Sequence, residues 1–277
     1  MTEPTTTNYP NVAQSFGITG IVVLGMLFLS PVLTLENLIG KEAAMLVYYL
    51  LAIGIPFWIV YSIRRDKTNC RSFNLTIENK RIIPWIIVGT VALLFGVISP
   101  IASLIPMPES IKKAFMDFAG QTGFFAFLLM VVAAPILEEL IFRGIILDGL
   151  LKKYSPTKSI LISSVLFGLV HLNPWQFVTG LVIGIFSGWV YHKTRSLSFS
   201  IIIHAAANLS GFITRQFADM ESSVNDTLVE SYGGMTNLIL AIAGSVFLAT
   251  VSIYRLRKEF ETLDITGTVR LGVEPVK

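Results

Sequence analysis

Three stretches of the sequence carry ionisable or amide side chains within runs of otherwise apolar residues. In chain order, these side chains are Glu138, Glu139, Arg143, His171, His204 and Asn208. Ionisable groups inside a membrane are costly and tend to mark functional sites. The chain has three histidines, and the third, His192, lies in a basic polar segment where it is expected to be solvated.

Helical spacing separates the two adjacent glutamates by role. Glu139 and Arg143 are four residues apart, so they share one helix face and can pair within the bilayer. Glu138 points about 100° away from Glu139 on a helix of 3.6 residues per turn and has no such cation. A carboxylate in apolar surroundings has a raised affinity for protons, which suits a general acid or base. We therefore predict a structural Glu139 and a chemical Glu138.

Together these residue types are sufficient for hydrolysis of an amide by water. Glu138 and a histidine that converge on one water molecule could deprotonate it. A second histidine and an asparagine amide could donate to the oxyanion that forms when the water attacks a carbonyl. Neither a Gly-x-Ser-x-Gly elbow nor a His-Glu-x-x-His zinc motif occurs in the chain.

The composition places this chemistry in a membrane. The chain has 277 residues, of which 53% are hydrophobic and 14% are charged, whereas soluble domains carry about 25% charged residues. The single cysteine, Cys70, excludes an internal disulfide and a cysteine-rich metal site. No basic run with interleaved aromatic residues suggests a nucleic-acid partner.

We predict an all-α integral membrane protein with about eight transmembrane helices. A span needs about 20 apolar residues, and the first apolar run lacks the features of a cleavable signal peptide. The expected spans are 15–35, 43–63, 83–105, 122–150, 157–173, 175–191, 197–214 and 235–254. The candidate residues fall on the fourth, fifth and seventh of these spans.

Charge at the ends of the spans predicts the orientation. Alternate loops are basic, through Arg64, Arg65, Lys67, Arg71, Lys80, Arg81, Lys152, Lys153, Lys158, Lys193, Arg195, Arg255, Arg257 and Lys258. The opposite loops hold only Lys41, Lys112, Lys113 and Arg215, and segment 215–230 is acidic. Because cytoplasmic loops are enriched in Lys and Arg, both termini are expected in the cytoplasm of a multi-pass cell-membrane protein.

The chain divides into four expected regions. A cytoplasmic N-terminal tail covers 1–14, and spans 1–3 with an outer linker cover 15–120. The catalytic core covers 121–215. An outer acidic loop, the last span and a cytoplasmic tail cover 216–277. Within the linker, segment 107–120 is expected either as an amphipathic helix on the outer interface or as a plain connection.

The three motifs resemble the signature of the CAAX protease and bacteriocin-processing family of membrane peptidases, also called CPBP or Abi. That signature is Glu-Glu-x-x-x-Arg, Phe-x-x-x-His and His-x-x-x-Asn on separate membrane helices. The matching segments are 138–143, 167–171 and 204–208, and the resemblance covers roughly residues 120–215. None of the motif residues departs from the signature.

The resemblance implies a glutamate-dependent intramembrane endopeptidase, and we expect no cofactor. By analogy, Glu138 and His171 activate water, while His204 and Asn208 form the oxyanion site. Glu139, Arg143 and Phe167 would support them, although packing alone is the simpler role for Phe167. The substrate would be a membrane-associated peptide or protein. The family's cavity is described as opening towards the cytoplasm, which agrees with the orientation expected here.

Four alternatives remain open from the sequence. The buried charges could be an ion-pair network that only holds helices together, with Asn208 as an interhelical hydrogen bond. The protein could be a non-proteolytic membrane scaffold or a bacteriocin self-immunity protein. Buried Glu and His residues also form proton relays in transporters, although no paired interrupted helices suggest inverted repeats. Finally, Glu138, His171 and His204 could bind a catalytic zinc ion.

Overall fold

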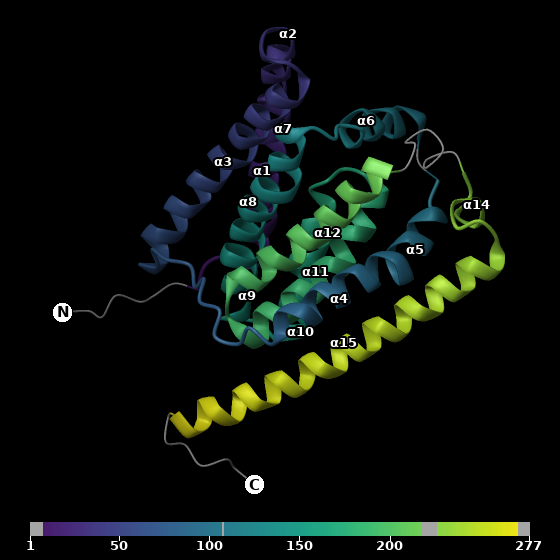
Figure 1. Ribbon diagram of the computed structural model, residues 1–277. Helices are drawn as coiled ribbons and strands as arrows, with labels where there is room; N and C mark the ends of the chain where they lie inside the picture. The colour runs from purple at the N-terminus through teal and green to yellow at the C-terminus, as the bar shows by residue number, and fades with distance from the viewer. Residues whose placement is uncertain (1–7, 107, 218–225, 271–277) are drawn as a thin grey trace.

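The computed structural model describes residues 8–106, 108–217 and 226–270, and every regular element within these ranges is a helix (Figure 1). The all-α prediction is therefore confirmed for the described residues. Of the outer acidic loop expected from the sequence, Asp219 and Glu221 lie outside these ranges.

The N-terminal part consists of three long helical segments and one short amphipathic helix. The first segment joins α1 (Val12–Phe28), the 3₁₀ turn η1 (Ser30–Leu35) and α2 (Glu36–Ile39), and α3 (Lys41–Thr68) returns beside it. The third segment joins α4 (Ile82–Leu93), the π-helical η2 (Leu94–Ile98) and α5 (Ser99–Ser103). Helix α6 (Glu109–Ala119) follows where the sequence suggested an amphipathic helix or a linker.

The fourth helical segment carries both glutamates and is widened twice by π-helical turns. It comprises α7 (Phe124–Phe127), η3 (Leu128–Ala133), α8 (Ala134–Ile141), η4 (Phe142–Leu147) and α9 (Asp148–Leu151). The remaining helices are α10 (Pro156–Leu169), α11 (Pro174–Thr194), α12 (Leu197–Phe217), α14 (Leu228–Ser231) and α15 (Met235–Arg270).

Six helical segments of the described chain are long and apolar enough to cross a membrane, which makes this a multi-pass membrane protein. They correspond to the first four, the seventh and the eighth of the expected spans. The fifth corresponds to α10, which has 14 residues. The sixth corresponds to α11, which has 21 residues but is not among the six. The count of eight and the cytoplasmic termini stay predictions.

The helical bundle has two distinct ends. At one, here called the basic end, Asp148 lies 2.6 Å from Lys152 Nζ and 3.9 Å from guanidinium nitrogens of Arg64 and Arg195. At the other, here called the α6 end, Lys41 pairs with the α6 residue Asp117. Figure 1 shows α2 and α6 at one extremity of the bundle and α9 at the other.

Helices α10 and α11 pack closely because small residues face each other. A Cβ added to Gly180 would lie 2.8 Å from the Cα of Gly168, and one added to Gly184 would lie 2.9 Å from the Cβ of Ser164. Small residues let membrane helices approach closely. The tight pairing fixes the short turn between the two helices, and that turn carries His171.

Candidate active site

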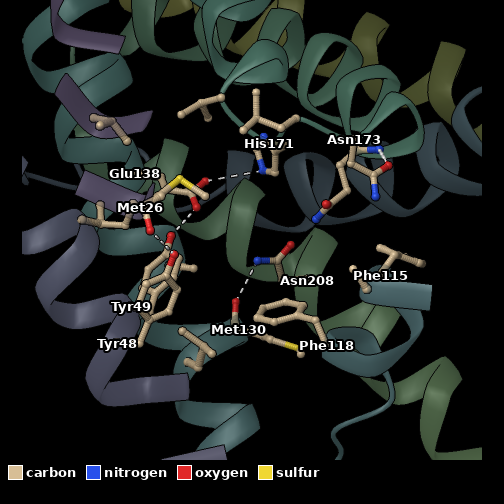
Figure 2. A pocket seen from close by; sticks show the side chains of 18 of the residues that line it. Met26, Tyr48, Tyr49, Phe115, Phe118, Met130, Glu138, His171, Asn173 and Asn208 are labelled. Atoms are coloured by element: carbon tan, nitrogen blue, oxygen red, sulfur yellow. Dashed lines mark hydrogen bonds and ion pairs between the residues drawn. The ribbon is translucent and has the colours of Figure 1, made fainter. Parts of the chain in front are cut away.

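Glu138 lies midway along the widened helix and presents its two carboxylate oxygens differently (Figure 2). Oε1 accepts a hydrogen bond from the hydroxyl of Tyr49 on α3. Oε2 is buried and accepts no hydrogen bond from the described residues. It lies 4.0 Å from Nε2 of His171 and 3.9 Å from Nε2 of His204. The structure thus brings one free carboxylate oxygen and two imidazoles together from three helical segments.

The expected span 157–173 placed His171 on a helix, but in the structure this residue lies outside one. Helix α10 ends at Leu169, and His171 occupies the following turn, just before Leu172 with its left-handed φ of 53°. The four-residue spacing still brings His171 close to Phe167, because Nδ1 of His171 lies 2.8 Å from the carbonyl oxygen of Phe167. That carbonyl can only accept, so Nδ1 carries the proton. In the neutral ring, Nε2 then offers its lone pair towards Glu138.

Glu139 is fully buried and anchors a network on the other face of α8. Its Oε1 accepts from Arg143 Nη1 at 2.9 Å and from His204 Nδ1 at 3.0 Å. Its Oε2 lies 3.4 Å from the hydroxyl of Ser187 on α11. The network orients the His204 ring, so that Nδ1 faces Glu139 and Nε2 faces Glu138. A carboxylate behind a histidine fixes its orientation in this way in many sites.

Phe167 packs within this cluster. Its ring lies under the guanidinium of Arg143 at 4.3 Å and meets the rings of His171 and His204 edge-on at 5.2 and 5.4 Å. The ring is 2% exposed. Phe167 thus separates and orients the charged groups by contact.

Asn208 lines the same cavity and satisfies a carbonyl that a proline leaves free. In the π-helical register of η3, the N–H of Ala134 bonds to the carbonyl of Leu129. The next donor would be residue 135, with Met130 as acceptor, but Pro135 has no N–H. Asn208 Nδ2 donates to the carbonyl oxygen of Met130 at 2.7 Å instead. The second Nδ2 hydrogen remains for another acceptor.

A cavity of about 660 Å³ contains these groups. Its polar lining includes Glu138, His171, His204, Asn208 and Arg215, while its walls are mostly apolar side chains from α1, α3, α6, η3 and α8. The cavity extends from Glu138 towards the α6 end, where Phe115 and Phe118 of α6 line it (Figure 2).

The position of the cavity brings two expectations from the sequence into conflict with each other. The basic loops were expected in the cytoplasm, and the family resemblance implied a cavity that opens towards the cytoplasm. The cavity instead extends to the α6 end, away from the loops that carry Lys152 and Arg195. The two expectations cannot both hold.

Two contributing residues were not singled out from the sequence, Tyr49 and Ser187. Tyr49 is separated from Glu138 by 89 residues and Ser187 from Glu139 by 48. No local spacing connects such pairs. The available signal was the presence of a hydroxyl in an apolar span, which many packed helices share.

The possible zinc ligands are not arranged as a metal cluster. No group of three His, Cys, Asp or Glu side chains placed to hold a metal ion occurs in the described ranges. Glu138 lies about equally far from both imidazoles, at 3.9 and 4.0 Å. This geometry fits a shared small ligand such as water, and chelation tests the zinc alternative directly.

Residues 120–210 match the family model described as type II CAAX prenyl endopeptidase Rce1-like. The proteins UPF0177 YxdF and UPF0177 YbdI of Lactococcus lactis subsp. lactis (strain IL1403) are 36% and 35% identical over 84 and 86 residues. These stretches cover 30% and 31% of this chain and 46% of each relative. A Bacillus subtilis (strain 168) protein named "Putative membrane peptidase YdiL" is 35% identical over 77 residues, 28% of this chain and 32% of its own.

The matches thus span less than half the length of these relatives. No solved structure gave a significant match. The matched segment contains all three motifs, so the family predicted from them is confirmed for that segment.

Proposed function

Since residues 120–210 belong to the Rce1-like family of membrane peptidases, we propose that this protein is an intramembrane endopeptidase of the glutamic type. It hydrolyses a peptide bond of a membrane-associated protein or peptide with an activated water molecule. The observation that carries the proposal is the free Oε2 of Glu138 at about equal distance from two imidazoles, 4.0 and 3.9 Å away. Such separations are too long for direct hydrogen bonds and suit a bridging water.

In the first step, Glu138 takes a proton from the water, which His171 positions through Nε2. The hydroxide oxygen attacks the carbonyl carbon of the scissile bond, and the carbonyl oxygen becomes an oxyanion. The protonated Glu138 then gives its proton to the leaving nitrogen as the C–N bond breaks. Tyr49 holds Glu138 Oε1 during both transfers through its hydroxyl.

The oxyanion is stabilised by Asn208 and His204. Asn208 donates the Nδ2 hydrogen that Met130 does not take. Because His204 Nδ1 already donates to Glu139, donation from Nε2 requires the doubly protonated ring. The carboxylate of Glu139, 3.0 Å from Nδ1, stabilises that cation. Removal of one preorganised oxyanion donor typically costs about 10²–10³ in kcat.

The experiment is comparative peptidomics of cells that carry the wild type, Glu138→Gln or Ser210→Ala. Among the described residues, the Ser210 hydroxyl bonds only to its own helix, to the carbonyl of Ala206, so its loss controls for expression and handling. A peptide that matures with the wild type and Ser210→Ala but not with Glu138→Gln supports the proposal. If cells that carry folded Glu138→Gln protein behave like cells with the wild type, the scaffold or self-immunity alternative is indicated.

Cleavage by the purified protein in nanodiscs then tests for a metal. We expect the rate to survive strong chelation, because the proposed water activation uses only Glu138 and His171. Loss of cleavage in the chelator, restored by added zinc, would replace this mechanism with the zinc alternative.

A further inference from the structure

The cavity is closed towards the basic end and reaches only the α6 end. Beyond Glu138 in the direction of the basic end, the interior is filled by side chains that are at most 1% exposed, namely Ile141, Phe142, Ile145, Ile146, Leu150 and Leu166. The Glu139–Arg143 pair lies in the same layer, with side chains 0% and 1% exposed. A polypeptide therefore has no open route to Glu138 from the basic end.

The wall of the cavity at its other extremity is formed by α6. Ile111, Ala114, Phe115 and Phe118 of this helix line the cavity. The helix has 11 residues, too few to span a bilayer of about 30 Å. It is fixed by the partly exposed Lys41–Asp117 pair and by the edge of Phe115 on Trp175, with ring centroids 5.9 Å apart. Exposed ion pairs contribute little to stability, so α6 covers this end of the cavity but is only weakly attached to the bundle.

The distribution of charge indicates which side of the membrane α6 faces. The basic residues of the chain concentrate in the loops at the basic end, which are tied to each other by contacts such as Asn74 Nδ2 to the Arg195 carbonyl at 3.1 Å. The α6 end carries few basic residues, together with the acidic Asp226 and Glu230 that follow α12. Lys and Arg mark the cytoplasmic side of membrane proteins.

We propose that substrate enters the active-site cavity from the non-cytoplasmic side, past α6. This inference rests on the proposed peptidase function and specifies its substrate class. The substrates are polypeptide segments that are exposed at, or translocated to, the non-cytoplasmic face. A substrate confined to the cytoplasmic face would reach the closed end of the bundle.

Cysteine accessibility tests the sidedness without any need for catalysis. In a Cys70→Ser background, Glu78→Cys marks the basic end and Glu109→Cys marks α6; both positions are exposed and both changes remove one acid. Acidic residues contribute little to orientation. In intact cells, we expect a membrane-impermeant maleimide to label Glu109→Cys, and to label Glu78→Cys only after permeabilisation. The reverse pattern would overturn the proposal.

A second measurement tests entry past α6. Ala114 is exposed and lines the cavity, whereas Glu109 does not line it. Treatment of intact cells with a bulky impermeant maleimide should block peptide maturation by Ala114→Cys and spare Glu109→Cys. Undiminished maturation by fully labelled Ala114→Cys would refute entry by this route. If Glu138→Gln has no effect on any peptide, the peptidase proposal fails, while the labelling pattern still decides which side the cavity faces.

Discussion

The hydrogen bond from Asn208 to Met130 predicts a measurable coupling between Asn208 and Pro135. Asn208→Leu leaves the Met130 carbonyl, freed by Pro135, without a donor in apolar surroundings. An unpaired buried acceptor costs about 1–3 kcal/mol, and interhelical hydrogen bonds in a membrane protein average about 0.6 kcal/mol, with a maximum near 1.7. We expect Asn208→Leu to lower the free energy of unfolding by about 1–2 kcal/mol.

The same substitution should cost less in a Pro135→Ala background, because residue 135 then supplies an N–H for the Met130 carbonyl. The double-mutant cycle should give a coupling of at least about 0.6 kcal/mol. Unfolding in mixed micelles, titrated with SDS and followed by tryptophan fluorescence, measures all four proteins. Ser210→Ala, also on α12, should cost the same in both backgrounds. Equal losses for Asn208→Leu with and without Pro135 would refute the account of the freed carbonyl.

Three further substitutions test the site and its support. Tyr49→Phe should fold normally and lower kcat in single-turnover cleavage about ten- to a hundred-fold, since a hydrogen bond to a charged group contributes about 1.5–3 kcal/mol; an unchanged kcat would remove Tyr49 from the mechanism. Arg143→Leu leaves a buried carboxylate without its cation and should destabilise the SDS-titrated protein by about 3–5 kcal/mol; a loss below 1 kcal/mol would contradict that role. Gly180→Ala should lower the free energy of unfolding by about 1–3 kcal/mol through overpacking. Gly17→Ala, with nothing within 4 Å of the added carbon, should leave it unchanged. Equal effects of the two substitutions would argue against close packing of α10 on α11.

Short-range helical geometry made part of this site predictable from the sequence. The four-residue spacing of Glu139 and Arg143 predicted a pair on one face, and the structure places their atoms 2.9 Å apart. The doublet spacing also predicted that Glu138 faces elsewhere, and its Oε2 is free of that pair. Both predictions need only the repeat of an α-helix, which does not depend on how the helices pack against each other.

Features that depend on packing between distant segments were not predictable. Tyr49 reaches Glu138 from a separate helix, and its sequence position gives no indication of that contact. The end of α10 at Leu169 depends on the turn into α11, so His171 was placed on a helix that stops before it. The direction of the cavity follows from which end of the bundle the core fills, a property of all its helices together.

The π-helical turn at η3 also determines how the length of this chain can vary. A widened turn holds one residue more than a regular one, so deletion of a single residue there could restore a regular helix. Because the widened turn absorbs the extra residue, everything beyond the deletion would keep roughly its present direction. Glu138 would still face the cavity, and Glu139 would still face the buried network. A homologue that lacks this bulge would therefore carry its acidic doublet one residue closer to the start of the helical segment, and sequence alignments across residues 128–139 should allow a one-residue gap.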